Sequence, residues 1–266
     1  MVKNGRRGQI AERPLATESD ADWQRRVVGR SLRTAAERSV DRGKNLIQAA
    51  ATVLARGDGQ DITVQDVADE AGQSLRTLYQ YFESKDDLLL AVFEEAMRTY
   101  ARLVEEAIAD LDDPLERLAG AMVAAVRMPE VSGAALDRGL IRLRLKLSES
   151  QPEMVGRAQS SVTSLILGLV EAAAAAGRIA ADDPEGVTFL ILTVNAAFIT
   201  AETVGNDAGV RQPDLAGVTA FCLRGLGAEL SDDWYERINA RLRLPVPRGP
   251  GAGGPPGVTP RRRAAK

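Results

Sequence analysis

Arginine, threonine, tyrosine and glutamine stand close together in the chain, at Arg76, Thr77, Tyr79 and Gln80. An arginine side chain makes two hydrogen bonds to the edge of a guanine, and a glutamine makes two to an adenine. The ring of Tyr79 could stack on a sugar or touch a thymine methyl group. These side chains therefore fit contacts with the base edges of DNA, provided that one helix presents them together.

The stretch around these residues predicts two short helices joined by a tight turn. Thr63 and Asp66 have the spacing of a capping box at the start of the first helix. Gly72 fits its end, because glycine takes the left-handed conformation without steric cost. Ala68 lets two helices cross closely, and Leu78 can hold the second helix against the first. This is the spacing of a helix-turn-helix unit.

Further residues of this stretch are candidates for contacts with the DNA backbone. Thr63 and Lys85 stand at expected helix starts, where a hydroxyl or a compact point charge can hold a phosphate. Ser74 and Tyr81 are candidates for the same role. The alternative is an ordinary helical hairpin in a core, which would not need such a set of exposed polar side chains.

Residues 77–82, TLYQYF, and residues 84–89, SKDDLL, resemble the signature of the TetR family of transcriptional repressors. Residues 62–68, ITVQDVA, are similar to the same family, and the strong resemblance covers roughly residues 46–93. It implies a homodimer that binds a double-stranded DNA operator through two helix-turn-helix heads. It also implies a ligand pocket in the middle helices and dimerisation through the last long ones. Many members have a small residue where Arg76 stands, so we expect an individual operator preference.

Composition favours an all-α fold. Of the 266 residues, 45% are hydrophobic and only 4% aromatic, and alanine and leucine dominate. The chain has no histidine and one cysteine, which excludes imidazole catalysis, histidine metal sites and an intramolecular disulfide. We expect an N-terminal three-helix DNA-binding domain, a larger C-terminal helical domain, and neither a cofactor nor a metal.

The charge distribution divides the chain into four segments. Residues 1–44 carry eleven basic against six acidic residues, and the tail after Leu244 carries five basic and no acidic ones. We predict a flexible or partly helical basic arm over 1–34 and the DNA-binding domain over 35–83. A ligand-binding and dimerisation domain follows over 84–244, and a disordered tail rich in proline, glycine and arginine over 245–266.

Two stretches of the body have ambiguous patterns. Residues 140–147, LIRLRLKL, alternate like a strand, but no partner strand is visible and the leucines also fit a helical stripe, so we predict a helix. The apolar run from about Glu185 to Val204 has nearly the length of a membrane span. Polar residues interrupt it, so we predict a buried or interfacial helix and no membrane association. The polar N-terminus lacks the apolar run of a signal peptide, and we expect a cytoplasmic protein.

The apolar stripes of the expected helices supply candidates for a pocket and for a dimer interface. The candidate pocket residues, whose character favours a lipophilic ligand, are Phe93, Met97, Tyr100, Met122, Val126, Leu143, Leu165, Leu169, Asn195 and Phe198. The candidate interface residues are Phe189, Leu192, Ala196, Ala220 and Leu223.

Two other function classes compete with a ligand-responsive repressor. An enzyme could use Arg142, Arg144, Glu149 and Glu202, but no nucleophile context or phosphate-binding loop accompanies these charges, which suit a solvated face. A helical protein-interaction module without sequence-specific DNA binding would explain the body of the chain. It would leave the polar set from Arg76 to Gln80 unexplained.

Overall fold

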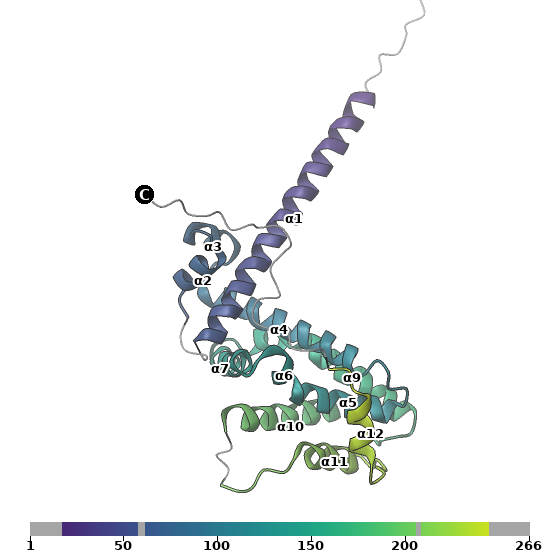
Figure 1. The fold of residues 1–266 in the computed structure, drawn as a ribbon. Helices are drawn as coiled ribbons and strands as arrows, with labels where there is room; N and C mark the ends of the chain where they lie inside the picture. The colour runs from purple at the N-terminus through teal and green to yellow at the C-terminus, as the bar shows by residue number, and fades with distance from the viewer. Residues whose placement is uncertain (1–17, 58–61, 206–208, 245–266) are drawn as a thin grey trace, which may run out of the picture. The chain divides into compact units, whose positions relative to one another are not determined.

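A computed structural model describes residues 18–57, 62–205 and 209–244, with side chains from residue 35 onward. Every element in these ranges is a helix (Figure 1), so the predicted all-α class is confirmed. The helices are α1 (Glu18–Arg56), α2 (Val64–Ala71), α3 (Leu75–Tyr81), α4 (Lys85–Ala107), α5 (Pro114–Arg127), α6 (Pro129–Ser132), α7 (Ala134–Ser150), α8 (Pro152–Ala158), α9 (Ser160–Ala175), α10 (Pro184–Val204), α11 (Leu215–Gly225) and α12 (Trp234–Arg241).

The chain forms two compact units, Met1–Asn45 and Leu46–Lys266. The apolar stripe of the sequence predicts a first domain helix from about Ser39 to Ala55, but α1 begins in the first unit, at Glu18. Alanine, arginine and glutamate, which all favour helices, recur through this stretch and extend the helix. The expected basic arm is therefore helical from Glu18 on. Residues 1–17 of that arm and the expected tail from 245 lie outside the described residues.

Local chemistry fixes the two short helices of the second unit as predicted. The Thr63 hydroxyl accepts a hydrogen bond from the Asp66 backbone N–H at 3.1 Å, and the Asp66 carboxylate accepts one from the Thr63 N–H at 3.1 Å. Gly72 ends α2 with φ +63°, in the left-handed region. Ser74 caps α3, and Leu78 is fully buried between the two helices. A capped, tightly turned helix-turn-helix results.

One hydrophobic core holds this helix-turn-helix in place. It joins the last turns of α1 and the inner faces of α2 and α3 to the first half of α4, and it also includes residues of α7 and α8. Gly139 of α7 lies so close to Leu54 that an added Cβ would come within 2.8 Å of the leucine side chain. The core thus crosses the boundary expected at residues 83–84.

A second hydrophobic core fills the rest of the body. It joins the end of α4 to α5, α9, α10, α11 and α12. Helix α4 runs through both cores, with Leu88 and Phe93 in the first and Val104 and Ala107 in the second. This one helix therefore connects the helix-turn-helix mechanically with the body.

The two ambiguous stretches resolve as helices. Residues 140–147 lie within α7, with Leu140, Leu143 and Leu147 buried, so the predicted helix is confirmed. Helix α10 is long and apolar enough to cross a membrane by length and composition, with a mean hydropathy of 1.7, which is weak evidence by itself. Its residues Ile191 and Phe198 are buried in the chain, and its placement away from membranes stays a prediction.

Pro152 fits the first turn of a helix, and the apolar stripe that follows it predicts one helix to about Ala176. This prediction is wrong, because the stretch forms two helices, α8 and α9, bent by 59° at Gln159. Helix α8 packs on α4 and α7, whereas α9 packs on α4, α5 and α10. Neither proline nor glycine stands at Gln159, so we attribute the bend to the packing of the two helices against different neighbours.

Candidate nucleic-acid interface and internal cavity

Helix α3 turns three of the predicted base-contacting side chains to solvent. Arg76, Tyr79 and Gln80 are exposed, and Tyr79 keeps 51% of its surface accessible although it is a large aromatic residue. Positions three and four apart share one face of a helix. The opposite face carries the buried Leu78. The structure thus brings these three residues together on one polar face.

The other candidates of this region take part in the local fold. The Ser74 hydroxyl accepts from the Thr77 N–H at 3.1 Å and lies 2.9 Å from the Thr77 hydroxyl. The Thr63 hydroxyl is committed to the capping box, where it also donates to Asp66 at 2.6 Å. Tyr81 packs against the first core, and Lys85 is the half-buried first residue of α4. Their contacts with DNA remain a prediction, while a structural role is directly visible.

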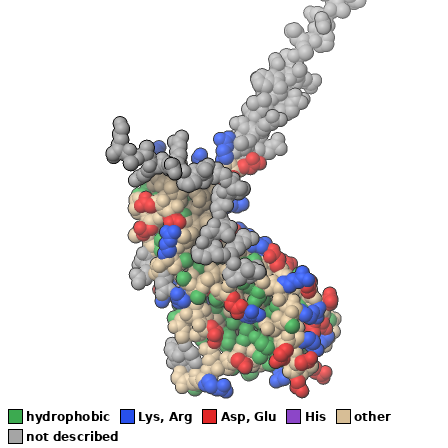
Figure 2. Space-filling model, in the orientation of Figure 1, with side chains coloured by type: hydrophobic (Ala, Val, Ile, Leu, Met, Phe, Trp, Pro, Cys, Tyr) green, Lys and Arg blue, Asp and Glu red, His purple; other side chains and the backbone are tan. Residues whose placement is uncertain are grey.

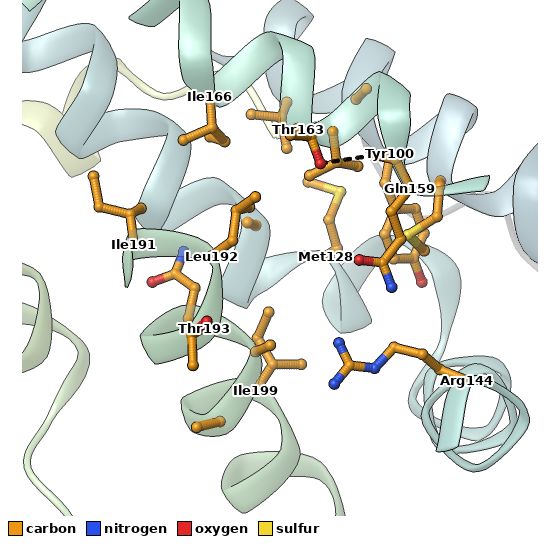
Figure 3. A pocket seen from close by; sticks show the side chains of 18 of the residues that line it. Tyr100, Met128, Arg144, Gln159, Thr163, Ile166, Ile191, Leu192, Thr193 and Ile199 are labelled. Atoms are coloured by element: carbon orange, nitrogen blue, oxygen red, sulfur yellow. Dashed lines mark hydrogen bonds between the residues drawn. The ribbon is translucent and has the colours of Figure 1, made fainter. Parts of the chain in front are cut away.

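The body contains a cavity of about 960 Å³ among α4, α5, α7, α9 and α10, partly open to solvent (Figure 3). Five of the predicted pocket residues line it: Phe93, Met97, Tyr100, Leu165 and Asn195. This volume is in the range of cavities that hold drug-sized ligands. Because most of its wall is aliphatic or aromatic, the cavity suits a largely apolar molecule.

The remaining predicted pocket residues lie elsewhere, and this part of the prediction is corrected. Met122, Leu143, Leu169 and Phe198 are buried in the two cores or within α10, and Val126 is half-buried outside the cavity wall. An apolar stripe identifies the inward face of a helix. It does not separate positions packed on a neighbour from positions facing a space.

Sequence reasoning missed several polar residues of the cavity wall. Asp137 and Arg144 line it from α7, and Thr188 lines it from α10 beside the predicted Asn195. The signal was present as a seven-residue spacing, Asp137 to Arg144 and Thr188 to Asn195, which returns to the same helix face after two turns. From the sequence alone, Arg144 suits a solvated charged face.

A polar cluster closes one part of the cavity. Tyr100 donates to the Ser132 hydroxyl at 3.3 Å, and that hydroxyl lies 2.8 Å from a carboxylate oxygen of Asp137 and 2.9 Å from the Met128 carbonyl. Burial raises the pKa of Asp137 to about 7. Ser132 has one proton to donate. A protonated Asp137 would satisfy the whole cluster by donating to Ser132, which then donates to Met128.

An apolar surface lies on α10 and α11. Phe189, Leu190 and Phe221 are 67%, 60% and 73% exposed, and Figure 2 shows hydrophobic side chains gathered in the region of α10. We call these three residues the exposed apolar face. Such a patch on a folded chain typically marks an interaction site.

The predicted interface residues divide between this face and the interior. Phe189 belongs to the exposed apolar face and also lines the cavity at its open side, and the half-buried Leu192 and Ala196 line the cavity as well. Ala220 and Leu223 lie in the second core at 8% and 0% exposure, so their placement at a partner surface is corrected. They are buried because α11 packs that side on α5.

Comparison with known proteins agrees with the geometry of the helix-turn-helix. Residues 46–92 match the sequence model of the bacterial regulatory proteins of the tetR family. Residues 46–92 therefore form a DNA-binding domain of the TetR type. In this domain α3 occupies the place of the DNA-reading helix of a helix-turn-helix unit, and the predicted resemblance to the TetR family is confirmed for these residues.

Curated relatives match the same region of the chain. The HTH-type transcriptional regulator BetI of Brucella canis is 36% identical over 78 residues, which are 29% of this chain and 39% of BetI. The fatty acid metabolism regulator protein of Bacillus subtilis is 34% identical over 74 residues, 28% of this chain and 38% of the relative. The chain thus spans about two fifths of the length of the curated relatives that it matches.

Solved structures extend the likeness to the body of the chain. RolR in complex with resorcinol superposes with a TM-score of 0.57 at 21% identity, over 80% of this chain and 98% of RolR. FadR of Bacillus subtilis in complex with stearoyl-CoA gives a TM-score of 0.54 at 22% identity, over 69% of this chain and 96% of FadR. At these identities the comparison shows a shared fold.

Proposed function

We propose that the chain is a homodimeric regulator of transcription that represses from a palindromic operator and is released by a small, largely apolar ligand. The observation that carries this proposal is the course of α4. Its first half packs under the helix-turn-helix, and its second half lines the cavity with Met97, Tyr100 and Val104. A molecule in the cavity therefore touches the same helix that supports the DNA-reading unit.

The polar face of α3 supports sequence-specific binding. Arg76 and Gln80 can each make two hydrogen bonds to a base edge, and Tyr79 between them can contact a sugar or a thymine methyl group. The buried Leu78 and the caps at Thr63 and Ser74 hold this face rigidly. Rigid presentation limits the conformational entropy that binding would otherwise cost.

The exposed apolar face supports a two-fold dimer. Two helices from each chain would form a four-helix contact that removes Phe189, Leu190 and Phe221 from water. Two heads related by a two-fold axis then read two half-sites related by the same symmetry. Operator binding would therefore depend on an interface far from α3 in the sequence.

Release by ligand follows from differential binding. A ligand that fits the cavity better in one arrangement of α4 shifts the population toward that arrangement, by no more than its difference in affinity for the two states. The ligand-bound FadR and RolR structures share this fold. We infer that this chain also uses its cavity for an effector.

Electrophoretic mobility shift with DNA from upstream of the chain's own gene tests the proposal. Wild-type protein should give a discrete shifted band that survives excess unrelated DNA. The double variant Arg76→Ala, Gln80→Ala should lose it, and Arg157→Ala, which removes an exposed arginine of α8, should retain it. Equal binding by all three proteins would favour the alternative of an interaction module without sequence-specific DNA binding.

A further inference from the structure

We propose that the cavity ligand is an amphipathic anion, with an apolar body and one carboxylate or phosphate group bound by Arg144. This inference rests on the proposed function, in that it takes the cavity to be the effector site. It goes further by specifying the chemical class of the effector and the residues that select it.

Arg144 places a positive charge at the cavity. Its half-buried side chain lines the cavity, and Figure 3 shows the guanidinium directed into it from α7. Within the described part of the chain, neither a hydrogen bond nor an ion pair joins it to another residue. A partly desolvated cation without a counter-charge is unfavourable. A planar guanidinium binds a carboxylate or phosphate through two parallel hydrogen bonds.

The other charged residues of the described cavity wall do not neutralise Arg144. Asp137 is only 4% exposed, and its carboxyl group is held by Ser132. Glu185 is exposed in the first turn of α10. Both are acidic, so Arg144 is the cation that this wall offers, and an incoming anion would meet its positive charge there.

The wall opposite Arg144 is mostly apolar. Ile166 of α9 and Ile191 and Leu192 of α10 lie across the cavity from the guanidinium in Figure 3. A ligand that reaches both sides must therefore combine a charged group with a hydrophobic body. The hydrophobic body of the ligand would bury apolar surface, while the charged group of the ligand remains paired with Arg144.

Two buried polar atoms indicate a further feature of that body. The Thr188 hydroxyl and the Asn195 carbonyl oxygen lack hydrogen-bond partners, although these residues are 2% and 6% exposed and line the cavity. The Asn195 amide nitrogen donates to the Met122 carbonyl at 3.3 Å, which fixes the free oxygen as an acceptor. A hydroxyl group on the ligand would supply the missing donor.

Isothermal titration calorimetry on the full-length protein without DNA tests the inference. The probes are oleate, oleyl phosphate, the neutral oleyl alcohol and the hydroxylated ricinoleate, each below its micelle-forming concentration. Both anions should bind at least about tenfold more tightly than the alcohol, since charge-assisted pairs to arginine are among the strong hydrogen bonds. The relative affinity of oleate and oleyl phosphate identifies which oxyanion the site prefers. Ricinoleate should bind more tightly than oleate.

Variants assign these preferences to residues. Arg144→Gln should reduce oleate to the affinity of oleyl alcohol, whereas Arg142→Gln, an exposed arginine on the same helix, should leave it unchanged. Asn195→Leu should abolish the advantage of ricinoleate over oleate. Circular dichroism melts confirm that each variant is folded before its affinities are compared.

The inference is overturned if oleate does not bind the wild-type protein, if alcohol and acid bind equally, or if Arg144→Gln keeps the preference for the anion. DNA release is measured separately. An anion that binds through Arg144 without affecting DNA would contradict the proposed function alone. Release of DNA by a neutral compound, with no binding of the anions, would contradict this inference alone.

Discussion

Arg76, Tyr79 and Gln80 share the exposed face of α3, and Arg76 stands where many members of the TetR family, which the sequence resembles, have a small residue. In Arg76→Ala, the cognate site should lose roughly 1–3 kcal/mol of binding free energy, and discrimination should relax at one base position per half-site. Binding to single-base variants of the operator measures both effects. Arg157→Ala is the control, and an unchanged base preference would remove Arg76 from the base-reading set.

Asp137 should make stability depend on pH. Its pKa is raised by burial from 3.8 to about 7, so the folded state holds a proton that the unfolded state releases at lower pH. The free energy of unfolding therefore falls as the pH rises from about 3.8 to about 7. Outside that window the contribution of Asp137 to this free energy does not change with pH. Asp137→Asn, which stays neutral, should lose this dependence.

Thermal melts at about pH 5 and about pH 8 check this prediction. The variant's melting temperature relative to wild type should be higher at pH 8 than at pH 5. Asp182→Asn, at an exposed position, provides the matched control. A difference between wild type and Asp137→Asn that does not change with pH would show that Asp137 is ionised throughout.

At the scale of the element, the turn of the helix-turn-helix depends on Gly72. Its φ of +63° costs an L-residue roughly 1–2 kcal/mol, although nothing lies within 4 Å of an added Cβ. Gly72→Ala should therefore lower the free energy of unfolding by about that amount and weaken DNA binding. Urea unfolding measures the change in the free energy of unfolding.

Gly156→Ala provides the control for this change, because Gly156 also has open space around it but lies within helix α8. Alanine there should leave stability unchanged or raise it by about 0.5–1 kcal/mol. If the two substitutions change the free energy of unfolding equally, the role of Gly72 is not to avoid backbone strain at the turn.

The same scale shows how far the sequence could predict the fold. Caps and turns are local chemistry, so Thr63, Ser74 and Gly72 could be placed correctly from neighbouring residues alone. The bend at Gln159 could not, because it arises from α8 and α9 packing on different helices. Phe221 and Leu223 are both apolar and two residues apart, and only the packing of α11 on α5 decides that Leu223 is buried and Phe221 exposed.

At the scale of the whole molecule, the proposed dimer places Phe221 in a water-excluded seam. Phe221→Arg should dissociate the dimer, because an unpaired charge is costly in an interface from which water is excluded. Sedimentation at micromolar concentration should show a wild-type dimer and a monomeric variant that no longer binds the operator. Leu145→Arg, on another helix and 53% exposed in wild type, should remain a dimer. A wild-type monomer would contradict the proposed interface.

Selection of binding sites from a randomised duplex library by the purified protein tests whether the chain reads DNA sequence as a two-fold dimer. Two α3 helices in a symmetric dimer should enrich a palindrome whose half-sites lie about 34–36 Å apart, one helical turn, or a multiple of that distance. Arg76→Ala should retain the symmetry and lose information at one position in each half-site. Recovery of DNA with no sequence preference, or of a single unpaired half-site, would contradict the account.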